Sequence, residues 1–246
     1  MGEKTTVRSV ERALDILLCF AQHAELSLTE IATLVGLNKS TVYRLLQSIE
    51  KKGFLIRDPK TEKYRLGYRI WDLSANLNRS EDPAVALLPE MEKLRDLLDE
   101  TVSLYIRDGK ERIRVQAVES RQVIRRVATI GARLPLYVGA SSKVLVAYAD
   151  PETQAMILND PDWPEEMNKE QFMLQLLQIQ QKGYAISIEE REKGTSAIAA
   201  PIKNHDGKLV AALAVSGPVG RLTKEKMEEI APIVVEYAKR MGHMVR

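Results

Sequence analysis

The stretch SLTEIATLVGLNKSTVYRLLQSIEKKGFLIR, residues 27–57, decides the fold of the N-terminal part of this chain. Ser27 and Glu30 have the S-x-x-E spacing of a capping box, in which each side chain accepts a hydrogen bond from a backbone N–H at a helix start. Gly36 tolerates the backbone conformation that ends a helix sharply, and Asn38 is a favourable N-cap for the next helix. Two short capped helices joined by a glycine turn predict a helix-turn-helix.

The second of these helices has distinct apolar and polar parts. Its apolar residues recur at helical spacing and predict a buried face. Its first two turns carry polar and basic residues: Lys39, Ser40, Thr41, Tyr43 and Arg44. In a helix-turn-helix the second helix lies in the major groove, and its N-terminal residues contact base edges. We therefore expect these five side chains to contact DNA. An ordinary pair of well-capped helices is the alternative explanation.

The residues after the second helix predict a two-stranded wing. Strand-like runs at 54–56 and 63–66 flank a turn at 58–61. A helix-turn-helix followed by such a ribbon is a winged helix, which favours DNA binding over an ordinary helical pair. We expect Lys60, Lys63 and Arg65 to place the wing on the DNA backbone, and Arg8 to reach a groove from the N-terminal arm. Solubility alone is the alternative role for the wing lysines.

The composition is that of a soluble protein with two domains. The 246 residues are 45% hydrophobic and 28% charged, and they suffice for two domains that each bury a core. Residues 1–80 carry 13 Lys or Arg against 9 Asp or Glu, whereas the remainder carries 23 against 25. A basic N-terminal module on a mildly acidic body suits a protein that docks DNA with one end.

The sequence also indicates where the protein works. Cys19 is the single cysteine and cannot form an internal disulfide. We find no long apolar span for a membrane and no N-terminal apolar segment with a cleavage signal. We therefore expect a cytoplasmic protein with no membrane partner.

Changes in apolar period predict the elements outside the winged helix. Helices are expected at 10–22 (capped by Ser9), 68–78, 83–99, 141–149, 169–182 and 223–241. Strands are expected at 102–106, 113–117, 123–128, 197–203 and 209–216. Consecutive hairpins flanked by helices predict an α+β domain with an antiparallel sheet. The expected organisation is a winged helix at 1–67, a linker helix at 68–82, with Asp82-Pro83 as the boundary, and a second domain at 83–246.

Several long segments resemble the IclR (isocitrate lyase regulator) family of transcription factors. SVERALDIL at 9–17, residues 27–55 and YRLG at 64–67 are similar to its DNA-binding domain. RLPLYVGASSKVLVAY at 133–148, KGYAISIEEREKGTSAIAAPI at 182–202 and GKLVAALAVSGPVGRLT at 207–223 resemble its effector-binding domain. The resemblance covers nearly the whole chain in the same order. It implies an α+β protein with an N-terminal winged helix-turn-helix, a linker helix and a C-terminal GAF-like antiparallel sheet domain flanked by helices.

The resemblance also implies a function. Family members bind palindromic operator DNA as dimers or tetramers, mostly as repressors, and respond to small carboxylates or aromatic metabolites. Carried over by position, the effector-binding residues are Val123, Arg126, Leu134, Ala140, Ser141, Ser187, Thr195, Ala197, Ala214 and Ser216. This chain departs from the family pattern in four places. It has Ala197 where a cysteine is frequent, Ser196 where an arginine is frequent, Ser187 where an acidic residue is frequent, and Ser142 in place of a glycine. The missing cysteine disfavours a metal or redox role for the pocket.

The residue types in this pocket favour an anion. Ser141, Ser187, Thr195 and Ser216 offer hydroxyls, and backbone N–H groups at the start of the 141–149 helix attract negative charge. A small carboxylate is the expected effector, and no cofactor is expected. Arg126 strengthens carboxylate binding if it faces inward, but the alternation along 123–128 leaves its direction open. Small neighbours such as Ala197 and Ala214 also admit a larger or less polar ligand.

Two other classes of function compete with a regulator. An enzyme is disfavoured because the three histidines, His23, His205 and His243, are scattered, and the sequence has no nucleophile elbow, phosphate loop or dinucleotide fingerprint. The charge run at 189–192 is typical of a solvated face. The second alternative is a metabolite sensor that uses its winged helix to dock onto another protein. We expect no enzymatic activity and no metal.

Overall fold

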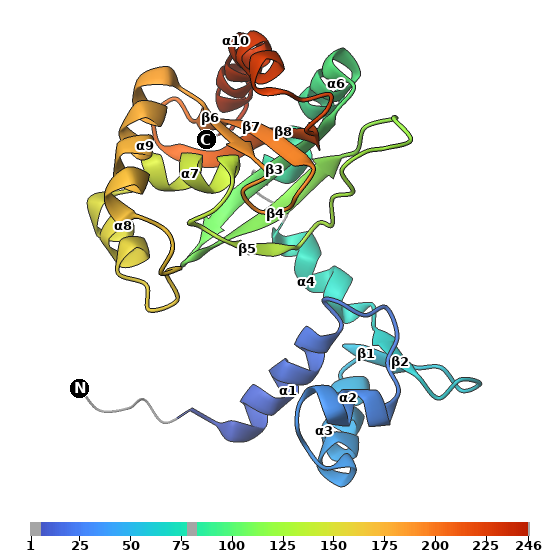
Figure 1. Cartoon of the computed structure of the whole chain (residues 1–246). Coiled ribbons are helices and arrows are strands. Elements are labelled where there is room, and N and C mark those ends of the chain that lie inside the picture. Colours follow the sequence, from blue (N-terminus) through green and yellow to red (C-terminus); the bar gives the residue numbers. More distant parts are fainter. Residues whose placement is uncertain (1–5, 78–82, 246) are drawn as a thin grey trace. The chain divides into compact units, whose positions relative to one another are not determined.

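Three helices and a two-stranded ribbon form the N-terminal part of the chain. The helices are α1 (Arg8–Cys19), α2 (Leu28–Leu34) and α3 (Lys39–Lys51), and the ribbon pairs β1 (Leu55–Arg57) with β2 (Tyr64–Leu66), as Figure 1 shows. The computed structural model describes residues 6–77 and 83–245, and the chain divides into two compact units, Met1–Ser80 and Glu81–Arg246.

Local capping explains where the helices of the first unit begin. The capping box is present, because Ser27 N donates to Glu30 Oε2 at 2.7 Å and Glu30 N donates to Ser27 Oγ at 3.3 Å. Gly36 has φ +64°, and Asn38 Oδ1 accepts from Thr41 N at 2.9 Å. These three predictions are confirmed.

The predicted start of the first helix is wrong. α1 begins at Arg8, and its N-cap is Val7, whose backbone carbonyl accepts from Val10 N and Glu11 N. Ser9 therefore lies inside the helix, and no side chain caps the start of α1. The helix also ends at Cys19, three residues earlier than expected.

One apolar cluster joins the helices of the first unit to the ribbon. Ile16 of α1, Ile31 of α2 and Leu46 of α3 are fully buried against Leu55 and Tyr64 of the ribbon. Burial of each such side chain contributes about 1.5–3 kcal/mol. A helix, α4 (Arg69–Leu77), follows the ribbon as predicted for the linker. The end of the predicted linker, including Asp82, lies outside the described residues.

The second unit is built on a six-stranded antiparallel sheet. Its helices are α5 (Pro83–Ala86), α6 (Leu88–Leu98), α7 (Ala140–Ala147), α8 (Pro151–Leu158), α9 (Lys169–Lys182) and α10 (Lys224–Gly242). Its strands are β3 (Thr101–Asp108), β4 (Glu111–Val118), β5 (Arg133–Pro135), β6 (Ala185–Ile188), β7 (Thr195–Lys203) and β8 (Leu209–Pro218). The strand order is β5-β4-β3-β8-β7-β6.

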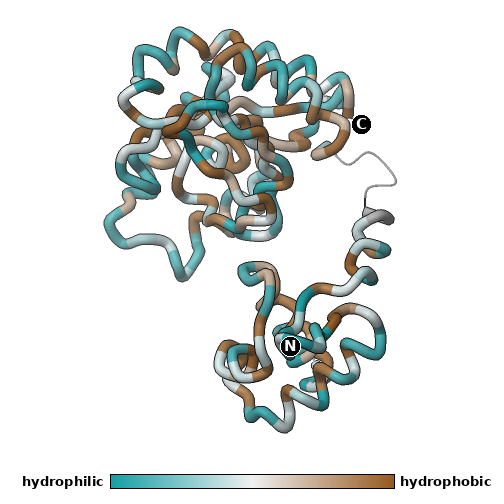
Figure 2. The backbone as a smooth tube through the Cα atoms, turned by 90° about the vertical axis from the view of Figure 1, so that its right-hand side faces the viewer, coloured by the Kyte–Doolittle hydropathy of each residue, from teal (hydrophilic) through white to brown (hydrophobic). Residues whose placement is uncertain are grey.

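Helices cover both faces of this sheet. α6 and α10 pack on one face, against Ile198 and Ile202 of β7 and Leu213 of β8. α7, α8 and α9 lie on the other face, where Ala199 and Ala212 of the same strands point (Figure 1). Because the alanines are small, α7 can approach the sheet closely. In Figure 2 the helices alternate hydrophilic and hydrophobic segments, as expected of helices with one buried side.

Two expectations for the second unit are corrected. The expected strand at 123–128 is irregular backbone, and the strand that follows β4 in the chain and pairs with its other edge is Arg133–Pro135. The expected helix at 83–99 divides at Leu87, because Pro89 lacks a backbone N–H and fits only the first turn of α6. The short elements α8 and β6 were not predicted.

The burial of β4 differs most from the expected pattern. Its apolar residues Ile113 and Val115 are only half-buried, whereas Arg112 and Arg114 are buried. Both faces of this strand are therefore covered, and the face that carries the arginines belongs to the site described below. In the part of the chain that the structure describes, no helix has the length and apolar character to cross a bilayer.

Candidate functional site

The polar start of α3 is an exposed ridge. Lys39, Ser40, Tyr43 and Arg44 are exposed and Thr41 is half-buried, while the opposite side of the helix is fixed in the core. Asn38 Oδ1 also accepts from Ser40 Oγ at 2.9 Å, so the cap holds the hydroxyl of Ser40 at the tip of the ridge. All five side chains predicted to contact DNA therefore lie on one accessible helix start.

The N-cap of α3 provides a test of how this ridge is held. Asn38→Ala leaves the Thr41 N–H without its side-chain partner and is expected to lower the stability of the first unit by about 1 kcal/mol. Asn168→Ala is a matched control, because Asn168 Oδ1 caps α9 in the second unit through Gln171 N at 2.9 Å. Hydrogen exchange of each unit in the intact chain measures the two effects. Equal protection of α3 in the wild type and in Asn38→Ala would contradict the expectation.

The basic residues of the wing are accessible as well. Lys60 and Arg65 are exposed and Lys63 is half-buried. Asp58 Oδ1 accepts from Lys60 N at 2.7 Å and Thr61 N at 3.1 Å, and these bonds lower the pKa of Asp58 and shape the turn. Arg8 is the first residue of α1 and does not lie in an extended arm, which corrects its expected placement, while its contact with DNA stays a prediction.

The cationic side chains of the ridge and the wing remain available to a partner. Lys39, Arg44, Lys60 and Arg65 form no salt bridge with any residue that the structure describes. The nearest pair, Arg57 with Glu62 at 2.8 Å, stabilises the wing itself. The arrangement fits a surface that contacts phosphates and base edges.

A second site is a cavity in the other unit, where the N-terminal end of α7 meets the sheet. It is lined by Tyr105, Arg112, Arg114, Arg126, Gly139, Ala140, Ser141, Ser187, Glu190, Arg191, Thr195, Ser196, Ala197, Ala214 and Ser216. Of the ten residues carried over from the resemblance, eight are in this lining: Arg126, Ala140, Ser141, Ser187, Thr195, Ala197, Ala214 and Ser216.

The other two residues are placed elsewhere. Val123 is 94% exposed, because its loop leaves the sheet edge, and it does not line the cavity. Leu134 on β5 packs against the apolar cluster around α7. The direction of Arg126, which the sequence leaves open, is toward the cavity, where its guanidinium pairs with Glu192.

Two buried arginines were missed by the sequence reasoning. Arg112 and Arg114 are each 4% exposed. Arg112 Nη1 donates to Ser141 Oγ at 2.8 Å, and its Nε has no partner among the described residues. Arg114 donates through Nε to the Tyr105 hydroxyl at 2.9 Å and through Nη1 to the Thr129 carbonyl at 3.2 Å. Their spacing on a strand was the available signal, because residues i and i+2 share a face.

The electrostatics of the cavity follow from this burial. Desolvation lowers the pKa of Arg112 to about 10, and the charge of Arg114 acts in the same direction, while Tyr105 and Glu190 oppose it. Both guanidinium groups lie over the Tyr105 ring, at 5.0 Å and 5.1 Å from its centroid. An anion beside these groups would favour their charged forms.

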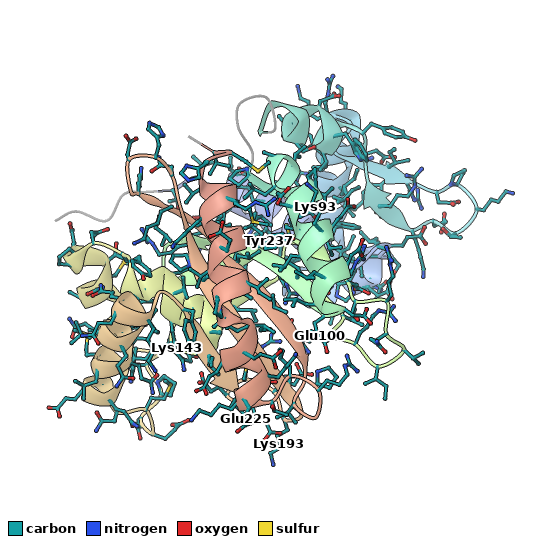
Figure 3. The ribbon with its side chains drawn as sticks, turned by 90° about the horizontal axis from the view of Figure 1, so that it is seen from above. Lys93, Glu100, Lys143, Lys193, Glu225 and Tyr237 are labelled. Atoms are coloured by element: carbon teal, nitrogen blue, oxygen red, sulfur yellow. The ribbon has the colours of Figure 1, made fainter. Side chains whose placement is uncertain are left out.

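The start of α7 completes the cavity. Gly139 has φ +92°, and a Cβ at this position would lie 3.1 Å from both terminal nitrogens of Arg112, so only glycine fits. The Gly139 N–H donates to Glu190 Oε2 at 3.1 Å. The other oxygen of Glu190 pairs with Lys143, a buried α7 residue labelled in Figure 3.

This chemistry suits binding of an anion. The cavity combines guanidinium groups and hydroxyls with the N-terminal end of α7, and it contains one carboxylate, that of Glu190. No group of three or more His, Cys, Asp or Glu that fits a metal ion occurs within residues 6–77 and 83–245.

An exposed basic winged helix together with a separate ligand cavity defines a DNA-binding transcriptional regulator. Comparison with known proteins gives its family. The family model described as the IclR helix-turn-helix domain matches residues 9–59, and that of the bacterial transcriptional regulator IclR C-terminal domain matches residues 80–243. The chain belongs to the IclR family, and the resemblance seen in the sequence is confirmed.

Individual relatives match over most of their length. The chain is 32% identical to the HTH-type transcriptional regulator XynR of Escherichia coli (strain K12), over 96% of this chain and 98% of XynR. It is 29% identical to the HTH-type transcriptional repressor AllR of the same strain, over 87% of this chain and 80% of AllR.

A solved structure confirms the fold. The IclR regulator from Alicyclobacillus acidocaldarius has a TM-score of 0.81 at 26% identity, covering 98% of this chain and 99% of that one. The α+β architecture predicted from sequence is therefore confirmed. The relatives are transcriptional regulators and not enzymes, so the enzyme alternative is set aside for this chain.

Proposed function

We propose that this regulator is a repressor that binds palindromic operator DNA as a dimer or tetramer, and that a small carboxylate in the cavity changes its affinity for DNA. The observation that carries the effector proposal is the pair of buried arginines, which hydrogen-bond to neutral groups. A buried charge is unfavourable unless an opposite charge or several hydrogen bonds compensate it. A carboxylate offers both.

Unsatisfied polar atoms support the same ligand. Within the described residues, the buried side-chain atoms without a hydrogen-bond partner are Arg112 Nε and Ser103 Oγ. Arg112 lines the cavity, and Ser103 lies directly opposite Ala214, another lining residue, so that the two side chains share a sheet face. Arg112 therefore keeps unfilled hydrogen-bonding capacity at the cavity wall, and the charge of an anionic ligand there would compensate its burial.

Two relatives support parts of the proposal. An IclR homolog from Microbacterium hydrocarbonoxydans, with a TM-score of 0.81 at 22% identity over 95% of this chain and 98% of that one, is complexed with 4-hydroxybenzoate, an aromatic carboxylate. The fold can therefore hold a ligand of this chemical class. AllR is named as a repressor, which supports repression here. Because the DNA that this regulator binds lies in the bacterial cytoplasm, we place the regulator there.

An apolar stripe on α1 supports the dimer. Val7, Val10, Leu14 and Leu18 are exposed at three- and four-residue spacing, which puts them on one side of the helix. Exposed apolar patches of this kind indicate a protein interface. A dimer with two-fold symmetry presents two recognition helices, and these require a palindromic operator.

Leu14→Glu tests the dimer surface. The substitution places a charge in the centre of the stripe and is expected to shift the protein toward monomers and to weaken operator binding. Leu174→Glu on α9 is the control, because Leu174 has a similar exposure in the other unit. Analytical ultracentrifugation measures the oligomer. A Leu14→Glu protein with the same sedimentation as the wild type would remove α1 from the interface.

Selection of duplexes from a random pool tests the function as a whole. We expect the retained sequences to share a palindrome, and their affinity to fall steeply with salt because phosphate contacts release counterions. Retention of no sequence would favour the alternative in which the winged helix docks a protein. Organic acids added to the selected duplex are expected to change its retention. A response to uncharged compounds alone would contradict the carboxylate proposal.

A further inference from the structure

The charges around the cavity do not balance. The cationic side chains at or next to its wall are Arg112, Arg114, Arg126, Lys143 and Arg191, and the carboxylates are Glu190 and Glu192. Glu190 is taken by Lys143. Glu192 pairs with Arg126 and lies 3.4 Å from Arg191. The salt bridges of the two carboxylates are thus with the outer cations. Arg112 and Arg114 of β4 form no salt bridge with a described residue, although the charge of Glu190 also favours the charged form of Arg112 and keeps its pKa from falling further.

Arg112 and Arg114 form one positively charged wall. They are two residues apart on β4, on the same face of the sheet, and both contact the ring of Tyr105. Their hydrogen-bond acceptors among the described residues are the Ser141 hydroxyl, the Tyr105 hydroxyl and the Thr129 carbonyl, all of them neutral. The face of an aromatic ring compensates a guanidinium only weakly in comparison with a carboxylate.

The two arginines offer separate contacts to a ligand. Arg112 lies against the start of α7, where the Gly139 N–H donates to Glu190 and the dipole of an eight-residue helix also favours negative charge. Arg114 is held by Tyr105 on the neighbouring strand. The cavity that they help to line has a volume of about 50 Å³, far below the ~300–1,000 Å³ of sites for drug-sized ligands.

We propose that the effector is a compact molecule with two acidic groups, and that Arg112 and Arg114 select it over an analogue with one. One acidic group lies against Arg112 and the start of α7, and the other lies against Arg114. This inference rests on the proposed carboxylate response and narrows it to a dianion, such as a short dicarboxylate.

Matched ligand pairs test the charge requirement. Oxalate and oxamate, malonate and malonamate, and succinate and succinamate have the same number of non-hydrogen atoms and differ by one charge. Calorimetry with the full-length protein at fixed ionic strength is expected to show at least one diacid that binds tenfold more tightly than its monoamide. Equal binding of the diacid and its monoamide in every pair would overturn the dianion while leaving the carboxylate proposal intact. Failure of every acid, including 4-hydroxybenzoate and phosphoglycolate, would overturn both.

Variants of the two arginines test the assignment. Arg112→Met and Arg114→Met are each expected to weaken diacid binding at least tenfold and to remove the preference over the monoamide. Arg112→Lys keeps the charge and is expected to retain that preference. Arg107→Met is the control, because Arg107 lies directly opposite Arg112 on β3 but is exposed and outside the cavity.

Thermal stability separates selection from a structural role. Because Arg112 is buried without a carboxylate partner, Arg112→Met is expected to raise the unfolding temperature of the ligand-free protein. A lower unfolding temperature together with an unchanged preference for the diacid would show that Arg112 only supports the fold, and would overturn its assignment.

Discussion

Arg44→Ala is expected to weaken binding to the selected operator by roughly 5- to 150-fold, which corresponds to about 1–3 kcal/mol. Arg44 lies on the exposed start of α3 and forms no salt bridge with a described residue, so its guanidinium can contact a base directly. An arginine in the major groove pairs with a guanine through two hydrogen bonds. The loss should therefore be accompanied by relaxed selectivity at one base pair of each half-site.

Lys52→Ala is the control for this prediction. Lys52 is the C-cap of the same helix and is exposed, so the substitution removes the same charge at the opposite end. Gel retardation at physiological salt, with the selected operator and single-base variants of it, measures both proteins. Equal losses in the two variants, with no change in base preference, would show that Arg44 contributes only general charge.

Arg221→Ala is expected to reduce the free energy of unfolding of the second unit by about 3 kcal/mol. Arg221 donates to both oxygens of Glu100, through Nε at 2.7 Å and Nη2 at 2.9 Å. The Glu100 side chain, labelled in Figure 3, is only 8% exposed. Without Arg221 its carboxylate would remain buried and unpaired. Arg221 itself is 38% exposed, which places the expected loss at the lower end of the range for buried pairs.

The packing around Glu100 leaves its carboxylate little room to move when Arg221 is absent. Its carboxylate lies against β8 so closely that a Cβ on Gly217 would come within 2.4 Å of Glu100 Oε2. Lys226→Ala is the control, because the pair of Lys226 with Glu229 at 2.7 Å is largely exposed and its loss should change stability by no more than about 0.5 kcal/mol. Urea denaturation of the full-length variants measures both. The double variant Arg221→Ala, Glu100→Gln should recover part of the lost stability, because it removes the unpaired charge. Similar urea midpoints for Arg221→Ala and Lys226→Ala would contradict the prediction.

The fold of the N-terminal, DNA-binding unit was largely predictable from sequence. The capping box of Ser27 and Glu30, the turn at Gly36 and the cap at Asn38 are all made between residues two to four positions apart. Such interactions are encoded locally, so their spacing in the chain predicts them without knowledge of the tertiary contacts. The exposed ridge at the start of α3 follows directly from them.

The cavity was predictable only in part. Eight of its residues were carried over from the family resemblance, but Arg112 and Arg114 were not. Their alternation with Ile113 and Val115 looks like a strand with one solvated face. The same ambiguity produced the false strand at 123–128, since a run with strand composition becomes a strand only where a partner edge accepts its hydrogen bonds.

The sequence by itself determined the winged helix, the alternation of apolar residues along the central strands and the family of the protein. The tertiary structure alone decided which faces of the strands are covered. β4 gains a buried face only because α7 and the loops after β5 and β6 close over it, and those segments are distant in the chain. The period of a strand defines two faces, but burial depends on what packs against each of them. For that reason two arginines that the sequence would leave in water lie inside the protein.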